Sequence, residues 1–109
     1  MKIKRTRQCA KCPWKKSTNP HEIPDGYSVE RHQLLSDTIA EPGALHTSPR
    51  LKVMGCHEHA THEQVHCVGW LNHQLGPGNN LALRLAVLGQ RFQLKLDGPQ
   101  HERFEDTIP

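Results

Sequence analysis

Aromatic side chains and long apolar runs are scarce in this chain of 109 residues. Only 5% of the residues are aromatic and 35% are hydrophobic, whereas eight prolines and eight glycines favour turns and loops. A small domain buries a limited share of its surface, so a core this lean usually needs a disulfide, a metal or a partner. The length suits one domain.

No stretch of the sequence has the apolar character of a targeting or membrane-spanning segment. Residues 1–8 are basic, but no apolar run follows them, and no run elsewhere approaches the length of a membrane span. We therefore expect a cytoplasmic protein without a membrane partner. In that reducing compartment, paired cysteines favour metal binding over disulfides, which remain the alternative.

Acidic residues are missing from residues 1–21, which hold seven lysines and arginines. Because the whole chain carries +3, the other 88 residues carry −4. A basic arm on a mildly acidic body suggests an anionic partner, either nucleic acid or an acidic protein surface. The alternative is a solvated terminus. The cations that we assign to partner binding are Lys2, Lys4, Arg5, Arg7, Lys15 and Lys16.

Four cysteines carry the strongest chemical signal. Cys9 and Cys12 form a C-x-x-C pair, and Cys56 and Cys67 enclose a histidine-rich stretch. Four thiolates make a closed tetrahedral Zn²⁺ site, and its binding energy would support a lean core. The second pair is too widely spaced for a knuckle, so Cys56 should end a strand and Cys67 should lie on the following helix.

Several readings of the ligand set stay open. One histidine could replace a cysteine in a Cys₃His site, a separate histidine site could exist, or the histidines could be solvated loop residues. An iron–sulfur cluster is also possible, because Pro13 follows Cys12 as in ferredoxin runs, although the ferredoxin spacing is absent. Buried cysteines without metal are the remaining reading. The alternative ligands are His57, His59, His62 and His66.

The spacing of apolar residues predicts a small single α+β domain, stapled by a Cys₄ metal site, with about three helices and a few short strands. Helices are expected at residues 28–40, 64–75 and 81–88, with Asn79 or Asn80 capping the third. Short strands are expected at residues 51–54 and 91–96, and residues 2–7 form an arm or an edge strand. We divide the chain into a basic arm (1–8), the metal-stapled domain (9–96) and an acidic tail (97–109) draped over the surface.

The motif Cys9-x-x-Cys12-Pro-Trp14, with Cys56-His57, Cys67-x-Gly69-Trp70-Leu71 and residues 80–86, resembles a family of small uncharacterised phage and bacterial proteins with four cysteines. The resemblance spans most of the chain. It implies a phage or prophage origin and a metal site, but no activity. Trp14 would cover the metal or anchor the arm, and Trp70 would lie in the core, with a contact surface as the alternative.

A second pattern is similar to zinc-stapled His-Asn-His endonucleases. Residues 56–59 and 71–76 carry the similarity, and the reactive side chains would be His57, His59, Asn72 or His73. The second C-x-x-C of those enzymes is missing, and Cys56 stands where an acid is expected. A hydrolytic metal also needs an open coordination position, which four cysteines would close.

No nucleophile–base arrangement and no phosphate-binding loop is recognisable in the sequence, so we lean against an enzyme. The size and the closed site favour a zinc-binding phage protein that binds and modulates a macromolecular partner, most simply a host protein. The alternative is a nucleic-acid-binding zinc module. It uses the basic arm and two helices joined by a Gly-Pro-Gly turn, with Arg84 as the candidate for reading bases.

Overall fold

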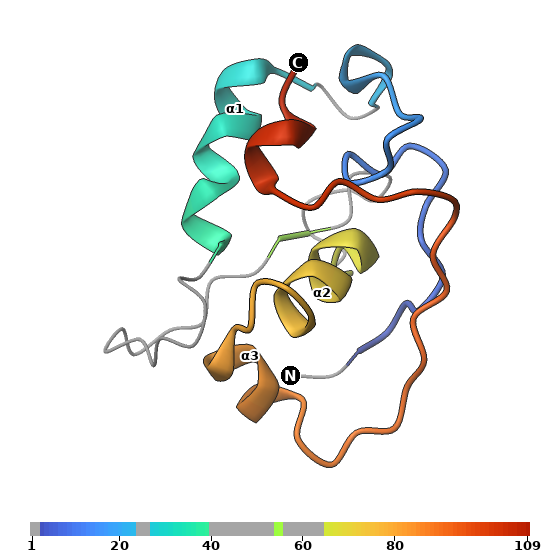
Figure 1. The fold of residues 1–109 in the computed structure, drawn as a ribbon, viewed down its shortest axis with the longest axis vertical. Coiled ribbons are helices and arrows are strands. Elements are labelled where there is room, and N and C mark those ends of the chain that lie inside the picture. The colour runs from blue at the N-terminus through green and yellow to red at the C-terminus, as the bar shows by residue number, and fades with distance from the viewer. Residues whose placement is uncertain (1–2, 24–26, 40–53, 56–64) are drawn as a thin grey trace.

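The computed structural model describes residues 3–23, 27–39, 54–55 and 65–109. Within these ranges the chain forms three α-helices, namely α1 (Val29–Leu34), α2 (Val68–Leu75) and α3 (Leu81–Ala86) (Figure 1). Three short 3₁₀ helices accompany them, η1 (Pro20–Glu22), η2 (Leu35–Thr38) and η3 (Phe104–Thr107). A radius of gyration of 13.1 Å is that of one compact domain. The prediction of a small single domain with three helices is confirmed.

Side-chain caps fix the starts of two helices. The Ser28 side chain accepts a hydrogen bond from Arg31 N at the start of α1, and Asn80 Oδ1 accepts one from Leu83 N at the start of α3. Each cap satisfies a backbone donor that has no partner within the helix. The predicted cap at Asn80 is therefore confirmed. The helix predicted at residues 28–40 is shorter, because α1 tightens into η2 after Leu34.

The helix predicted at residues 64–75 starts four residues late, at Val68. Gly55 forms an antiparallel bridge with His66, and Cys67 N donates to Met54 O at 2.9 Å. These contacts hold residues 66 and 67 extended, so that Cys67 becomes the N-cap of α2. Pairing with a distant segment has overridden the local apolar spacing.

The strand predicted at residues 91–96 is wrong for the part of the chain that the structure describes. Residues 3–7 and 91–96 share a single parallel bridge, between Arg7 and Lys95, and the other two bridges are also isolated. Two paired segments without a third strand are marginal on their own. The predicted α+β class therefore reduces to an α-rich domain with isolated bridges.

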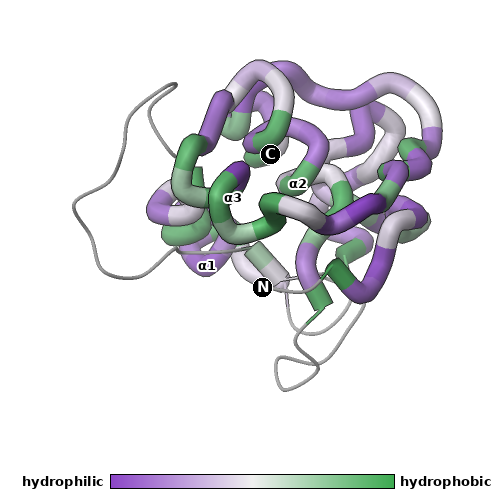
Figure 2. Tube along the Cα trace, turned by 90° about the horizontal axis from the view of Figure 1, so that it is seen from below, coloured by the Kyte–Doolittle hydropathy of each residue, from purple (hydrophilic) through white to green (hydrophobic). Residues whose placement is uncertain are grey.

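Helix α2 lies at the centre of the core (Figure 1). Trp70 and Leu71 on this helix have no exposed surface, and Trp70 Nε1 donates to Thr38 O at 3.0 Å, which joins α2 to the end of η2. Helix α3 is largely hydrophobic, whereas hydrophilic stretches run through the outer segments (Figure 2). The buried apolar cluster comprises Cys9, Cys12, Trp14, Met54, Cys67, Trp70, Leu71, Leu83, Val87 and Phe104. Trp70 is thus a core residue, as predicted.

The C-terminal segment is packed into the body, whereas we expected residues 97–109 to drape over the surface. Phe104 and Thr107 on η3 are buried. The Thr107 hydroxyl donates to Phe104 O, so its oxygen accepts from His32 Nε2 at 3.0 Å. His32 Nδ1 then accepts from the Tyr27 hydroxyl at 2.7 Å. The buried His32 on α1 therefore holds η3 in place, which the polar composition of the tail did not reveal.

Candidate metal centre

Three cysteine thiols from two distant segments gather in the core. Cys9 and Cys12 come from the C-x-x-C turn at residues 9–15, which we name the knuckle, and Cys67 comes from the start of α2. All three cysteines are buried and form no disulfide. Cys12 Sγ and Cys67 Sγ are 3.7 Å apart, well beyond the S–S bond length of about 2.05 Å. The Cys9 side chain also hydrogen-bonds to Cys12. The fold thus brings together the three predicted cysteine ligands that it describes.

The knuckle is a tight turn that surrounds the sulfur of Cys12 with donors. Cys12 N donates to Cys9 O at 3.3 Å, and Lys15 N donates to Cys12 O at 3.1 Å. Hydrogen bonds from Cys67 and Cys9 lower the pKa of the Cys12 thiol to about 3, with further help from Trp14 N–H and the Gln8 side chain. Hydrogen bonds to the charged form favour it, so this turn is built to hold a thiolate.

Gln8 ties the knuckle to the C-terminal segment. Its side chain exchanges two hydrogen bonds with the Gln100 amide, at 2.7 and 2.8 Å, and its Oε1 also accepts from Asp97 N at 2.9 Å. Gln8 is buried and donates to Cys12 as well. Gln100 thus holds the Gln8 side chain in the position from which Gln8 donates to the Cys12 sulfur. Neither residue was predicted, because an isolated glutamine carries no sequence signal for such a role.

Gly69, in the first turn of α2, lets the helix touch the knuckle. A Cβ atom at this position would lie 2.5 Å from Trp14 Cβ and 2.8 Å from Cys12 Sγ. Real Cβ atoms essentially never come closer than 3.0 Å. Only glycine therefore permits this approach between α2 and the knuckle, and the same approach brings Cys67 to Cys12.

Trp14 closes the inner side of the cluster and stacks on His73 of α2. The two ring centroids are 4.6 Å apart and the rings are inclined by 25°. The Gln74 amide donates to His73 Nδ1 at 2.9 Å, so the proton of His73 resides on Nε2, which donates to the Glu102 carbonyl. Burial lowers the pKa of His73 below its usual 6.5. His73 is therefore a neutral packing residue.

The hydrogen-bond chain continues from α2 into the cap of α3. Asn80 Nδ2 donates to Gln74 Oε1 at 3.0 Å, while Asn80 Oδ1 accepts from Leu83 N. Gln74 is fully buried and Asn80 nearly so. Because every amide atom has one defined partner, this network fixes the orientation of α3 relative to α2 and to the Trp14 ring.

The structure describes His66 among the four predicted histidine ligands. His57, His59 and His62, together with Cys56, lie outside the described residues. His66 is described; burial is the main cause that lowers its pKa, followed by the positive charges of the N-terminus and Lys4. Its Nδ1 is buried and has no hydrogen-bond partner among the described residues.

Taken by themselves, the described residues contain no group of three histidine, cysteine or acidic side chains that could hold a metal ion. The cluster of three thiols is therefore part of a site at most. A complete site would require at least one further ligand from outside the described residues.

The predicted partner-binding cations differ in accessibility. Lys4, Arg7 and Lys16 are exposed and Arg5 is half-buried, while Lys2 lies outside the described residues. Lys15 is buried, and its ammonium group donates to Asp97 Oδ2 at 2.6 Å and to Ala10 O. Lys15 therefore secures the C-terminal segment instead of facing a partner. None of the described helices is long and apolar enough to cross a membrane.

Arg84, the candidate for reading bases, is occupied within the fold. Its Nε donates to Asn79 Oδ1 at 2.9 Å, and its Nη2 donates to Leu75 O. These bonds fasten the turn between α2 and α3. The resemblance of the two helices to a helix-turn-helix thus lacks a free arginine at the expected position.

A model of a family of unknown function, DUF6283, matches residues 4–107 of the chain. The match includes all four cysteines and all three α-helices. No curated protein and no solved structure matches the sequence.

Proposed function

Since the chain belongs to DUF6283, a family of unknown function, we propose a role built on its thiol cluster: a non-enzymatic, zinc-stapled module that binds a macromolecular partner. Cys9, Cys12 and Cys67 would supply three of the zinc ligands. Zinc would fasten the knuckle to α2 and so hold the domain together. The separation of 3.7 Å between Cys12 Sγ and Cys67 Sγ carries this proposal.

That separation suits two ligands of one zinc ion. With Zn–S bonds of about 2.3 Å, the edge of a regular tetrahedron is about 3.8 Å. A contact between two thiols can have a similar length, so the distance supports zinc without requiring it. The surroundings add weight, because thiol pairs that only pack do not need backbone and amide donors directed at the sulfur.

The donors around Cys12 are those that a metal-bound thiolate requires. Metal ligands are commonly held by an outer layer of hydrogen bonds, which orients them and adjusts their basicity. Trp14 N–H and the Gln8 amide supply such bonds to Cys12, and Gln8 is in turn held by Gln100. This layer is made of described residues and would persist whichever side chain completes the site.

For the fourth ligand we propose Cys56 in preference to His66. Gly55, which directly precedes Cys56, forms an antiparallel bridge with His66. Side chains alternate between the two faces of extended backbone, so consecutive residues point to opposite sides. His66 would therefore point away from the face that Cys67 uses, whereas Cys56 would share that face if the register continued by one residue.

The composition explains why a staple is needed. A structural zinc ion contributes roughly 10–16 kcal/mol of apparent binding energy, which becomes folding energy when the free chain lacks the site. Whole domains are stable by only about 5–15 kcal/mol. With few aromatic residues in the core, the metal would decide whether this domain folds at all.

The resemblance to phage and bacterial four-cysteine proteins suggests the biological setting. We propose a cytoplasmic protein of phage or prophage origin that modulates a host macromolecule. The His-Asn-His nuclease alternative loses support, because His73 is held between Trp14, Gln74 and the Glu102 carbonyl.

Elemental analysis and an optical spectrum of the freshly purified protein test the staple. We expect one zinc per chain and no visible absorbance. A brown chromophore with iron would instead establish the iron–sulfur alternative, and a folded protein without any metal would refute both.

Variants then identify the fourth ligand. Cobalt substituted for zinc gives a sulfur-to-metal charge-transfer band that grows with the number of thiolate ligands. We expect Cys56→Ser to weaken this band and His66→Ala to leave it unchanged. His21→Ala, at an exposed histidine that was not predicted as a ligand, is the control for nonspecific effects. A reversed result for Cys56 and His66 would make the site Cys₃His.

A further inference from the structure

Five cations lie on two neighbouring backbone segments from opposite ends of the chain, which together we name the basic strip. It consists of Lys4, Arg5, Arg7, Arg91 and Lys95. The sequence assigned the first three to a separate basic arm and gave the last two no role. The pairing between the two segments unites them.

Backbone hydrogen bonds align the segments. Gln8 N donates to Lys95 O at 2.8 Å, and Lys95 N donates to Thr6 O at 2.7 Å, in a parallel arrangement. At the other end, Ile3 N donates to Gln90 Oε1 at 3.0 Å. In Figure 1, the N-terminal segment (blue) and the segment that follows α3 (orange) approach each other to the right of α2. The arm is therefore docked, with its cations beside those of the second segment.

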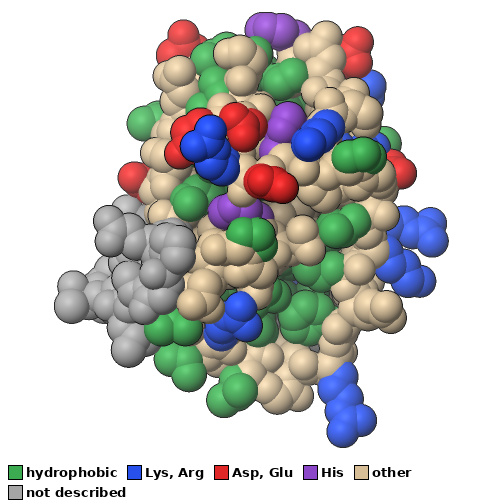
Figure 3. All heavy atoms as spheres, in the orientation of Figure 1, with side chains coloured by type: hydrophobic (Ala, Val, Ile, Leu, Met, Phe, Trp, Pro, Cys, Tyr) green, Lys and Arg blue, Asp and Glu red, His purple; other side chains and the backbone are tan. Residues whose placement is uncertain are grey.

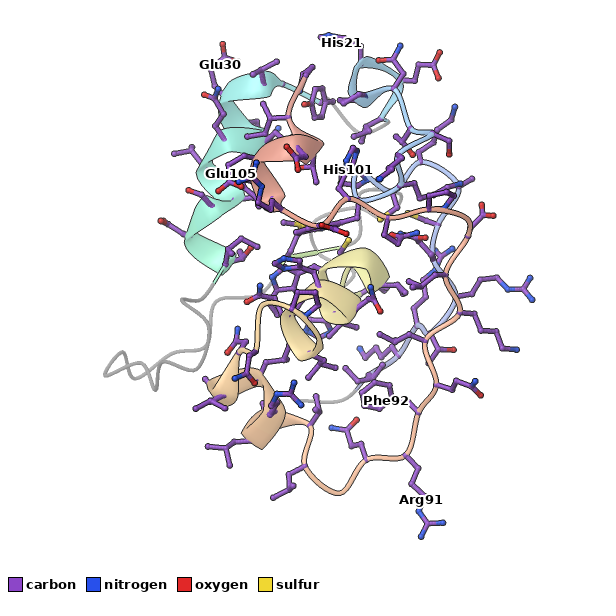
Figure 4. All side chains as sticks on the ribbon, in the orientation of Figure 1. His21, Glu30, Arg91, Phe92, His101 and Glu105 are labelled. Atoms are coloured by element: carbon purple, nitrogen blue, oxygen red, sulfur yellow. The ribbon has the colours of Figure 1, made fainter. Side chains whose placement is uncertain are left out.

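Exposure alternates along the second segment and turns its cations outward. Arg91, Gln93 and Lys95 are exposed, whereas Phe92 and Leu94 are half-buried and pack against the core. Figure 4 shows Arg91 directed away from the body and Phe92 directed inward. The outer face of the strip thus carries positive charge, and its apolar side chains are used for internal packing.

No carboxylate interrupts the strip. Residues 3–8 and 90–96 contain no aspartate or glutamate. The nearest acid along the chain, Asp97, pairs with Lys15. Among the described residues, Lys4, Arg7, Arg91 and Lys95 form no ion pair. In Figure 3, lysine and arginine side chains project from the right-hand side and the lower edge of the face shown.

We propose that the basic strip binds the phosphate backbone of a nucleic acid. In extended backbone, at about 3.3 Å per residue, Arg91 and Lys95 are roughly 13 Å apart. A partner must therefore present several negative charges along that length, and each strand of a duplex carries one per about 3.4 Å of axis. Three of the five cations are arginines, whose planar forks match phosphate oxygens in pairs.

The same features argue against an acidic protein as the partner. Protein–protein interfaces usually centre on an apolar core with aromatic anchors, and lysine is depleted there. In the strip, Ile3, Phe92 and Leu94 pack against the body. Leu96, beside Lys95, is the exposed large apolar side chain of the two described segments, and a surface on which cations otherwise predominate suits a partner that is held by charge. This inference does not depend on the metal, because every residue of the strip lies in a described segment outside the knuckle.

Fluorescence anisotropy with a labelled dT20 oligonucleotide and a labelled 20-bp duplex tests the proposal. If all five cations contact phosphates, a plot of the logarithm of the association constant for the single strand against the logarithm of the salt concentration should have a slope of about −3.5. The association constant should then fall on the order of 100-fold between about 50 and 200 mM salt. The double variant Arg91→Gln/Lys95→Gln should weaken binding by on the order of tenfold at 200 mM and reduce the slope by about 1.4.

The matched control is Arg31→Gln/Arg103→Gln, which removes the same charge from exposed positions on α1 and before η3. We expect it to change affinity by less than about twofold, since it removes no phosphate contact. Equal weakening by the two double variants would reduce the effect to net charge and overturn the proposal. Competition by polyglutamate as strong as that by the oligonucleotide would overturn it in favour of an acidic protein. Zinc content and thermal unfolding of each variant separate failure of the strip from failure of the staple.

Discussion

Replacing Gly69 by alanine tests whether the close contact between α2 and the knuckle is essential. Elsewhere in a helix this change usually stabilises a protein by up to about 1 kcal/mol, because glycine is a poor helix former. Here the new methyl group would lie 2.5 Å from Trp14 Cβ and 2.8 Å from both Cys12 Sγ and Trp14 Cδ1. Helix propensity and packing therefore predict opposite signs.

Packing should decide the outcome, because the atoms that meet the methyl group cannot move freely. Trp14 stacks on His73, and its carbonyl accepts from His101 N at 2.8 Å. Overpacking of a dense core costs about 1–3 kcal/mol, and three contacts below 3.0 Å place this case near the upper end. After the gain in helix propensity is subtracted, we expect a net loss of about 2 kcal/mol.

Urea unfolding at a fixed concentration of free zinc measures this loss, which should lower the midpoint by about 1–2 M. Zinc affinity should fall as well, because a shift of α2 moves Cys67 away from Cys12. Gly55→Ala is the control, since its Cβ would lie 3.8 Å from Val65 O, an ordinary contact. If Gly69→Ala is as stable as the parent protein, the packing argument is refuted.

Three further predictions concern polar groups that the fold has buried. Asn80→Ala should cost about 2–4 kcal/mol in urea unfolding, because it removes a helix cap and the donor to the buried Gln74 Oε1, whereas Ser28→Ala, at the less buried cap of α1, should cost about 1 kcal/mol. Burial lowers the pKa of His73 from 6.5, so the unfolded chain takes up a proton first as the pH falls. The contribution of His73 to the free energy of unfolding should thus be fully present above pH 6.5 and decrease as the pH falls below it. Urea unfolding of His73→Gln from about pH 7.5 to about 5.5 should therefore show a smaller decrease in the free energy of unfolding than the parent protein. Lys15→Gln should lower the free energy of unfolding without changing dT20 affinity, because its partners lie within the chain; an affinity loss equal to that of the Arg91→Gln/Lys95→Gln variant would contradict this assignment.

Local signals in the sequence predicted local structure well. The cap at Asn80 and the end of α2 at Gly76 follow from residue types that satisfy helix ends. The C-x-x-C spacing predicted a tight turn with two inward thiols, and Cys9 and Cys12 are arranged in that way. In these cases the physical cause acts over a few neighbouring residues, so that one short stretch contains all the information.

Features that depend on distant partners could not be predicted in the same way. The alternation at residues 91–96 correctly indicates that Arg91, Gln93 and Lys95 face outward, but it cannot show that, within the described ranges, a single bridge to Arg7 is all that pairs with this segment. The helical spacing around Gly69 does not reveal that Trp14 packs against this position. The basic run around Lys15 predicted a cation that faces a partner. Its actual partner, Asp97, lies 82 positions later in the chain, so the local sequence could not indicate the pair.

The enclosure of the knuckle by the C-terminal segment has a consequence for how the chain folds. Trp14 O accepts from His101 N, and Gln8 pairs with Gln100, so contacts around the first cysteine pair span 87 to 92 positions of sequence. The chain must lose the entropy of closing this long loop before the contacts can stabilise it, and this slows folding. During synthesis, Cys9 and Cys12 leave the ribosome long before the residues that cover them. The knuckle would therefore remain open to oxidation and to competing metals until translation has passed residue 101.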